Sequence, residues 1–192
     1  MKKILIINGH PMKDSFCGAI AEKYQNAALS SGAQCEIIHL IDLQFDPILR
    51  YGYTKRMEME PDLLKAQAAI ADANHIVLVY PNWWATYPAL LKGFIDRSFV
   101  PGFAFKYREN SPLWDKLLSN KTARMIVTMD TPTWFYSLVY KNCGHNAIKT
   151  GVLEFSGIKP VKITSFAPLK GSSVQQRTKW LDKVERLGKQ MI

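Results

Sequence analysis

Short, uninterrupted runs of aliphatic residues are the feature that most restricts how this chain can fold. Ile4–Ile7 and Ile76–Tyr80 are the clearest of them, and turn-forming residues follow each run. Such a run is typical of a strand buried on both faces, whereas a half-exposed strand alternates apolar and polar residues. Stretches with helical spacing lie between the runs, and no internal repeat occurs. The sequence therefore predicts an α/β protein with a parallel sheet between two layers of helices.

Five strands are expected to alternate with five helices along the chain. The predicted strands are 4–7, 35–40, 76–80, 123–129 and 161–166. The predicted helices cover about 15–30, 62–72, a stretch from near Pro88, 147–155, and from 172 or 173 to the C-terminus. Ser15 is expected to cap the first helix and Pro61 to occupy the first position of the second. Residues 41–60, 99–119 and 130–142 are expected to be irregular, and 1–192 to form one domain.

The loop after the first strand decides between two common strand orders. A dinucleotide-binding sheet needs G-x-G-x-x-G at this place, and here Gly9 is the only glycine between residues 8 and 16. The order 2-1-3-4-5 is the better fit. It places a ligand site at the carboxyl ends of the strands, in the loops after the first, third and fourth strands.

The first loop (residues 9–15) lies between a buried strand and a helix N-terminus. Backbone N–H groups there attract anions, and His10, Lys13 and Ser15 add side-chain donors. The pattern fits either a phosphate site or a plain turn in which Ser15 only caps the helix.

The second loop (residues 81–88) holds two adjacent tryptophans, Trp83 and Trp84. Both cannot enter one core face, so at least one is expected to be exposed or to line a cleft. They could wall in a planar ligand, or they could pack on neighbouring loops or a partner subunit. The third loop (residues 128–136) offers hydroxyls and aromatic rings, and its composition favours neither binding nor packing.

Composition and charge exclude several classes of protein. The chain is 47% hydrophobic and 21% charged, which is ordinary for a globular protein. Its net charge of +9 comes from lysines and arginines spread singly, so neither nucleic acid nor a membrane surface is favoured as a partner. Three scattered cysteines predict no disulfide framework and indicate the cytoplasm. No ligand pair stands at zinc spacing beside Cys143-Gly144-His145, so no metal is expected.

Three motifs, in this order along the chain, carry a resemblance to a known family. They are His10-Pro11-x-x-x-Ser15-Phe16, Tyr80-Pro81-x-Trp83-Trp84-x-x-x-Pro88-Ala89-Leu90-Leu91-Lys92-Gly93, and Pro101-Gly102-Phe103-Ala104-Phe105. Over roughly residues 1–170 the chain resembles the NAD(P)H:quinone oxidoreductases, which are flavoproteins with a flavodoxin-like fold.

The resemblance implies roles for residues in all three loops. The implied flavin-binding positions are His10, Ser15, Phe16, Cys17, Pro81, Asn82, Trp83, Trp84, Ala85, Thr128, Asp130 and Thr131. Tyr136 matches a tyrosine that lies beside the flavin in relatives. A histidine that assists hydride transfer falls at Asn142 here, and His145 is the nearby candidate to replace it. Relatives often have two glycines where this chain has Asp130 and Thr131.

The implied activity is ping-pong hydride transfer from NAD(P)H, through bound flavin, to a quinone or similar small acceptor. FMN is favoured over FAD because the short first loop suits a single phosphate. A homodimer is expected, because aromatic residues crowd the site loops and residues 99–119. The alternative is a non-enzymatic protein, either a flavodoxin-type electron carrier or a regulatory subunit of a membrane transporter. The basic charge and the 99–119 segment favour the enzyme.

Overall fold

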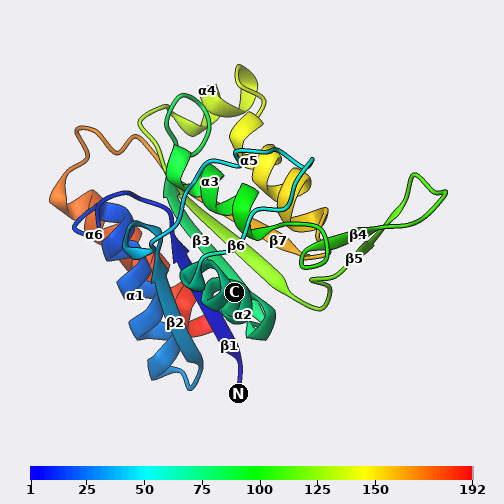
Figure 1. Cartoon of the computed structure of the whole chain (residues 1–192). Helices are drawn as coiled ribbons and strands as arrows, with labels where there is room; N and C mark the ends of the chain where they lie inside the picture. Colours follow the sequence, from blue (N-terminus) through cyan, green and yellow to red (C-terminus); the bar gives the residue numbers. More distant parts are fainter. Residues whose placement is uncertain (192) are drawn as a thin grey trace.

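A five-stranded parallel sheet of order β2-β1-β3-β6-β7 organises the protein, as the computed structural model of residues 1–191 shows (Figure 1). Its strands are β1 (Lys3–Asn8), β2 (Gln34–His39), β3 (His75–Pro81), β6 (Thr122–Thr128) and β7 (Val161–Phe166). A separate antiparallel pair, β4 (Phe105–Tyr107) and β5 (Trp114–Lys116), extends from the body. The predicted order of the five main strands is confirmed.

Helices cover both faces of the sheet. They are α1 (Phe16–Ser30), α2 (Pro61–Asp72), α3 (Ala89–Ser98), α4 (Thr133–Leu138), α5 (Cys143–Ile148) and α6 (Val174–Gln190), with a 3₁₀ turn η1 (Leu40–Asp42) and a π-helical turn η2 (Lys149–Glu154). α1 and α6 pack on one face, and α2, α3 and the α5–η2 segment on the other. Among the residues described, no helix has the length and apolar character needed to cross a membrane.

The continuous aliphatic strands serve two separate cores. Successive side chains point to opposite faces of a sheet, so Ile6 packs with Ile20 of α1 while its neighbour Leu5 packs with Leu63 of α2. All four side chains are almost completely buried. This double burial is why the central strands show no polar alternation.

The helix starts predicted from the sequence are confirmed at three places. Ser15 caps α1 by accepting a hydrogen bond from the Gly18 N–H at 3.2 Å, and Ser173 caps α6 in the same way. Pro61 occupies the first position of α2. These caps satisfy N–H groups that have no partner within the helix.

Two stretches expected to be irregular contain short elements. Residues 130–142 contain the six-residue helix α4. The helix predicted over 147–155 begins earlier, at Cys143, and continues as the π-helical turn η2. Residues 99–119 hold the β4–β5 pair. There Trp114 stacks on Phe155 with ring centroids 4.3 Å apart, and Phe105 is buried, whereas Tyr107 is exposed. The aromatic cluster expected to be exposed is therefore partly a small core of its own.

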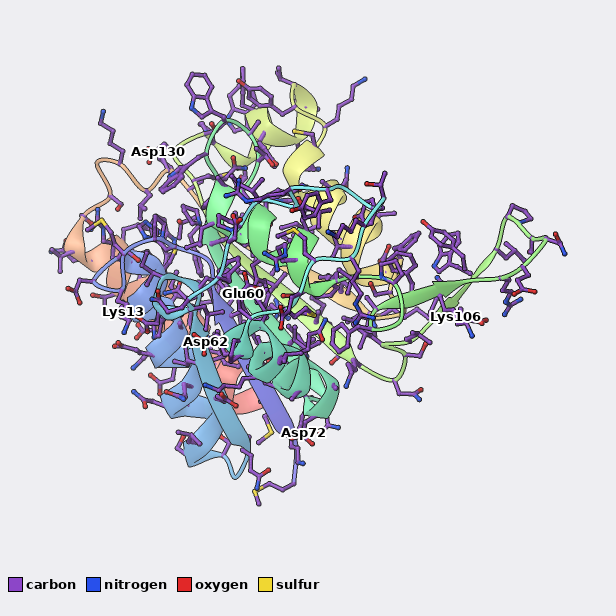
Figure 2. All side chains as sticks on the ribbon, viewed as in Figure 1. Lys13, Glu60, Asp62, Asp72, Lys106 and Asp130 are labelled. Atoms are coloured by element: carbon purple, nitrogen blue, oxygen red, sulfur yellow. The ribbon has the colours of Figure 1, made fainter. Side chains whose placement is uncertain are left out.

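A buried arginine fixes the irregular segment before α2. The Arg97 guanidinium on α3 pairs with the Glu60 carboxylate at 2.8 Å and donates to the carbonyl oxygens of Asp46 and Glu58. Glu60 lies immediately before α2 (Figure 2). One side chain thus attaches both ends of the 46–60 segment to the body.

Candidate functional site

The three loops singled out from the sequence meet at one edge of the sheet. β1, β3 and β6 are adjacent parallel strands, so their carboxyl ends lie together. The Gly9 N–H donates to the Val79 carbonyl at 2.8 Å, and the Asn82 N–H donates to the Thr128 carbonyl at 2.7 Å. These bonds join the first loop to β3 and the second loop to β6. Lys13 and Asp130 mark the first and third loops in Figure 2.

The first loop is ordered by its own hydrogen bonds. The Asn8 side chain accepts from the His10 N–H at 3.1 Å, and His10 Nδ1 accepts from the Met12 N–H at 3.0 Å. Partial burial lowers the pKa of His10, so its ring is neutral at neutral pH. Because Nδ1 is the acceptor, the proton lies on Nε2, which is left as a donor. No acidic residue occupies the first turn of α1, so no side chain of that turn repels an anion.

Cys17 links the first loop to the third. Its Sγ lies 3.4 Å from Thr128 Oγ1, and both side chains are buried. Burial raises the pKa of the Cys17 thiol to about 12, so the thiol stays protonated and is not a nucleophile. What Cys17 can offer a ligand is its backbone N–H at the start of α1.

Two charged residues that no sequence motif groups with the site lie beside the first loop. The Arg177 guanidinium on α6 lies over the Phe16 ring, 5.8 Å from its centroid. Asp42 in η1 pairs with Lys13 at 2.6 Å. Both come from distant parts of the chain and reach the loop only through the packing of α6 and η1. No local pattern would have identified them.

The second loop forms a tight, strained turn. Trp83 and Thr86 exchange two backbone hydrogen bonds, of 2.9 and 3.0 Å. Trp84 and Ala85 between them have φ values of 52° and 60°, the pattern of a type I′ turn. Trp84 is 98% exposed and Trp83 is 44% exposed, with its ring against His10. The expectation that at least one tryptophan is exposed is confirmed.

In the third loop, two of the expected binding side chains already have protein partners. Asp130 accepts from the Lys170 N–H at 2.6 Å and so holds the segment after β7. Thr128 is occupied by its contact with Cys17. Thr131 is half-buried and has a free hydroxyl within residues 1–191. Flavin contacts from Thr128, Asp130 and Thr131 stay a prediction.

Tyr136 and His145 lie together behind the second loop. Their ring centroids are 4.9 Å apart, and both side chains are buried. His145 Nε2 lies 3.0 Å from Ser165 Oγ, and burial lowers the pKa of His145 to about 4. Its ring is therefore neutral at neutral pH. At the position where relatives have a histidine, the Asn142 side chain is turned towards Ser137. A direct part for Tyr136 and His145 in hydride transfer stays a prediction.

Metal ligands are not grouped at this edge of the sheet. Across residues 1–191, no three His, Cys, Asp or Glu side chains are placed to hold one ion. The groups assembled here are instead backbone N–H donors, cations and flat aromatic rings. Such a set suits a ligand with a phosphate at one end and a planar ring at the other.

Comparison with known proteins places this geometry in a family. The family model described as a flavodoxin-like fold matches residues 2–189, and the chain belongs to that family. Over 171 residues it is 30% identical to an uncharacterized NAD(P)H oxidoreductase of Haemophilus influenzae, covering 86% of this chain and 83% of that protein. The resemblance inferred from the three motifs is confirmed at the level of the family.

A further relative and a solved structure are also similar to this chain. NAD(P)H dehydrogenase (quinone) 1 of Cavia porcellus is 27% identical, over 83% of this chain and 66% of that enzyme. An FMN-dependent NADH-azoreductase from Bacillus anthracis, solved in complex with FMN, has a TM-score of 0.75 at 20% identity. The match covers 100% of this chain and 99% of that one. At 20% identity, the likeness to the azoreductase shows a shared fold.

Proposed function

We propose that the protein is a flavin-dependent NAD(P)H oxidoreductase that passes hydride to a quinone or a similar small acceptor. The observation that carries this proposal is that an anion-binding loop and an exposed aromatic turn meet at one edge of the sheet. The first loop presents N–H groups at the N-terminus of α1, with Lys13 and Arg177 beside them. The second loop presents an exposed turn with Trp84 at its tip.

The residues present fit a flavin mononucleotide. The α1 N-terminus would hold the phosphate, with His10 Nε2 and the Ser15 hydroxyl as further donors. Within residues 1–191, the N–H groups of Trp84 and Ala85 donate to no protein atom, so they can face the edge of a flavin ring. Residues 1–191 contain no second loop of the dinucleotide type for an adenine half, which favours FMN over FAD.

The chain's own part is to bind, orient and exclude water. Bound flavin would supply the hydride carrier between NAD(P)H and the acceptor. The two exposed N–H groups of the second loop would stabilise negative charge that develops on the ring. Trp84 would cover the face on which NAD(P)H and the acceptor stack in turn, which keeps the reacting atoms close and in line.

Flavin binding and reduction test the proposal directly. The purified protein should take up one FMN per chain in a fluorescence titration, and NADH or NADPH should then bleach the flavin band under anaerobic conditions. A quinone added afterwards should restore the band. Failure to bind any flavin would refute the proposal. Binding without direct reduction by either nucleotide would favour an electron carrier instead.

We also propose a homodimer with the flavin near the subunit boundary. Exposed apolar side chains gather around the candidate site, on the second loop, α4 and the segment after α4: Trp84, Trp134, Leu138, Val139 and Tyr140. A cavity of about 560 Å³ lies elsewhere, between the end of α3, the β4–β5 pair and η2. An exposed group of apolar side chains like that around the candidate site is costly on a monomer. Light scattering at micromolar concentration should give twice the chain mass of 21.8 kDa, and a monomeric mass would contradict the dimer.

A further inference from the structure

The strained turn at Trp84 and Ala85 needs support from outside itself. Both residues have positive φ, although neither is the glycine, asparagine or aspartate that such turns favour. A side chain with a Cβ is disfavoured in this conformation. The two hydrogen bonds between Trp83 and Thr86 close the turn but do not remove that cost. Strain of this kind persists only where the surroundings hold it.

Two side chains, from α4 and α5, hold the turn by hydrogen bonds to the Ala85 carbonyl, and the Gly144 N–H supports one of them. The Tyr136 hydroxyl donates to the Ala85 carbonyl at 2.9 Å and accepts from the Gly144 N–H at 3.0 Å. Cys143 Sγ donates to the same Ala85 carbonyl at 3.3 Å. The Tyr136 side chain is only 2% exposed. Its O–H is therefore already used within the protein, and it joins the second loop to the start of α5.

Gly144 makes this close approach possible. A Cβ at this position would lie 2.6 Å from the Ala85 carbonyl oxygen, 2.8 Å from Thr86 Cα and 2.9 Å from the Tyr136 hydroxyl. None of these neighbours can move aside without moving the turn. Burial raises the pKa of Tyr136, so the hydroxyl stays protonated and remains a donor.

We propose that Tyr136 is a positioning residue whose hydroxyl, together with Gly144, clamps the Trp84–Ala85 turn in the geometry that presents its backbone N–H groups. This inference rests on the proposed function, because flavin is the ligand that those N–H groups would bind. In this proposal the Tyr136 hydroxyl maintains the geometry of the site, and it does not donate a proton or a hydrogen bond to the reacting atoms.

The flavin-free protein gives the first test. In Tyr136→Phe, the ring remains but the clamp loses its central hydroxyl, so the turn should open more often. Amide hydrogen exchange of the Trp83 and Thr86 N–H groups should then be at least tenfold faster than in the unaltered protein. Adding Ala85→Gly to this variant should restore slow exchange, since glycine adopts positive φ without cost. Unchanged exchange in Tyr136→Phe would overturn the proposal whether or not flavin binds.

Flavin binding gives the second test. Tyr136→Phe should raise the FMN dissociation constant about tenfold, the effect of one lost buried hydrogen bond. Ala85→Gly in the same chain should restore most of the affinity. At saturating FMN, any slowing of flavin reduction by NAD(P)H in Tyr136→Phe should be reversed in the double variant together with the affinity, because the hydroxyl acts only through the position of the turn.

Tyr140→Phe is the matched control. Its ring neighbours that of Tyr136, with centroids 6.0 Å apart, but it is half-exposed and takes no part in the clamp. This variant should leave both exchange and FMN affinity unchanged. Normal FMN affinity in Tyr136→Phe with hydride transfer slowed tenfold or more would contradict the proposal and place the hydroxyl in the chemistry. If the unaltered protein binds no flavin, the proposed function fails, while the exchange experiment still decides the clamp.

Discussion

Gly18→Ala is expected to weaken FMN binding about 100-fold while leaving the protein folded. A Cβ on Gly18 would overlap the carbonyl oxygen of Lys13, so the first loop must move away from the N-terminus of α1. A displaced loop would cost the phosphate about two charge-assisted hydrogen bonds, at ~1.5 kcal/mol each. That sum corresponds to roughly two orders of magnitude in the dissociation constant. Fluorescence titration with FMN measures it.

Two controls show whether the loss of FMN affinity comes from the contacts to the phosphate. Riboflavin lacks the phosphate, so its weaker binding should be nearly the same in Gly18→Ala and in the unaltered protein. Gly151→Ala is the matched substitution, because a Cβ there meets no atom within 4 Å. It should change neither affinity. If Gly18→Ala bound FMN as tightly as the unaltered protein, the phosphate would have to lie away from the first loop.

The sheet could be predicted because its signal is local. The segments Ile4–Ile7 of β1 and Ile76–Tyr80 of β3 are buried on both faces, so all of their positions are apolar. The cap at Ser15 could be predicted for the same reason, since the hydroxyl bonds to an N–H three residues ahead. Strand order followed from the missing glycine pattern and was confirmed.

The short elements could not be predicted because distant contacts stabilise them. β5 depends on Trp114, whose indole N–H donates to the Phe155 carbonyl at 2.9 Å, 41 residues away. α4 has six residues and no side-chain cap, so nothing in its own sequence indicates a helix.

The candidate site shows the same division between local and distant signals. The sequence located the three loops, since each follows a strand whose end lies at the same sheet edge. It did not reveal that Arg177 reaches Phe16, or that the Tyr136 hydroxyl is occupied by Ala85 and Gly144. These facts depend on how helices pack, and family resemblance pointed to a different role for Tyr136.

Arg97→Met is expected to have the largest effect on stability. The substitution keeps an unbranched apolar stem but leaves the Glu60 carboxylate and the carbonyls of Asp46 and Glu58 without their partner. Removing one member of a buried ion pair typically costs ~3–5 kcal/mol. The Glu60 side chain is 28% exposed and can recruit water, so a loss of about 3 kcal/mol is expected. In a chain of this size the melting temperature should fall by roughly 6–12 °C.

Lys92→Met on the same helix is the control, because it removes an ordinary surface ion pair where Arg97→Met removes a buried one. Lys92 pairs with Asp96 at the surface, where the lysine side chain is 51% exposed, and its loss should cost less than about 1 kcal/mol. Arg97→Met should also release the 46–60 segment, so trypsin should cleave at Arg50, Lys55 or Arg56 under conditions where Lys92→Met stays intact. Equal melting temperatures for the two variants would show that the buried guanidinium does no more for stability than a surface lysine. Because Arg97 lies outside the three loops, FMN affinity of the folded variant should be unchanged, which distinguishes a stabilising contact from a binding one.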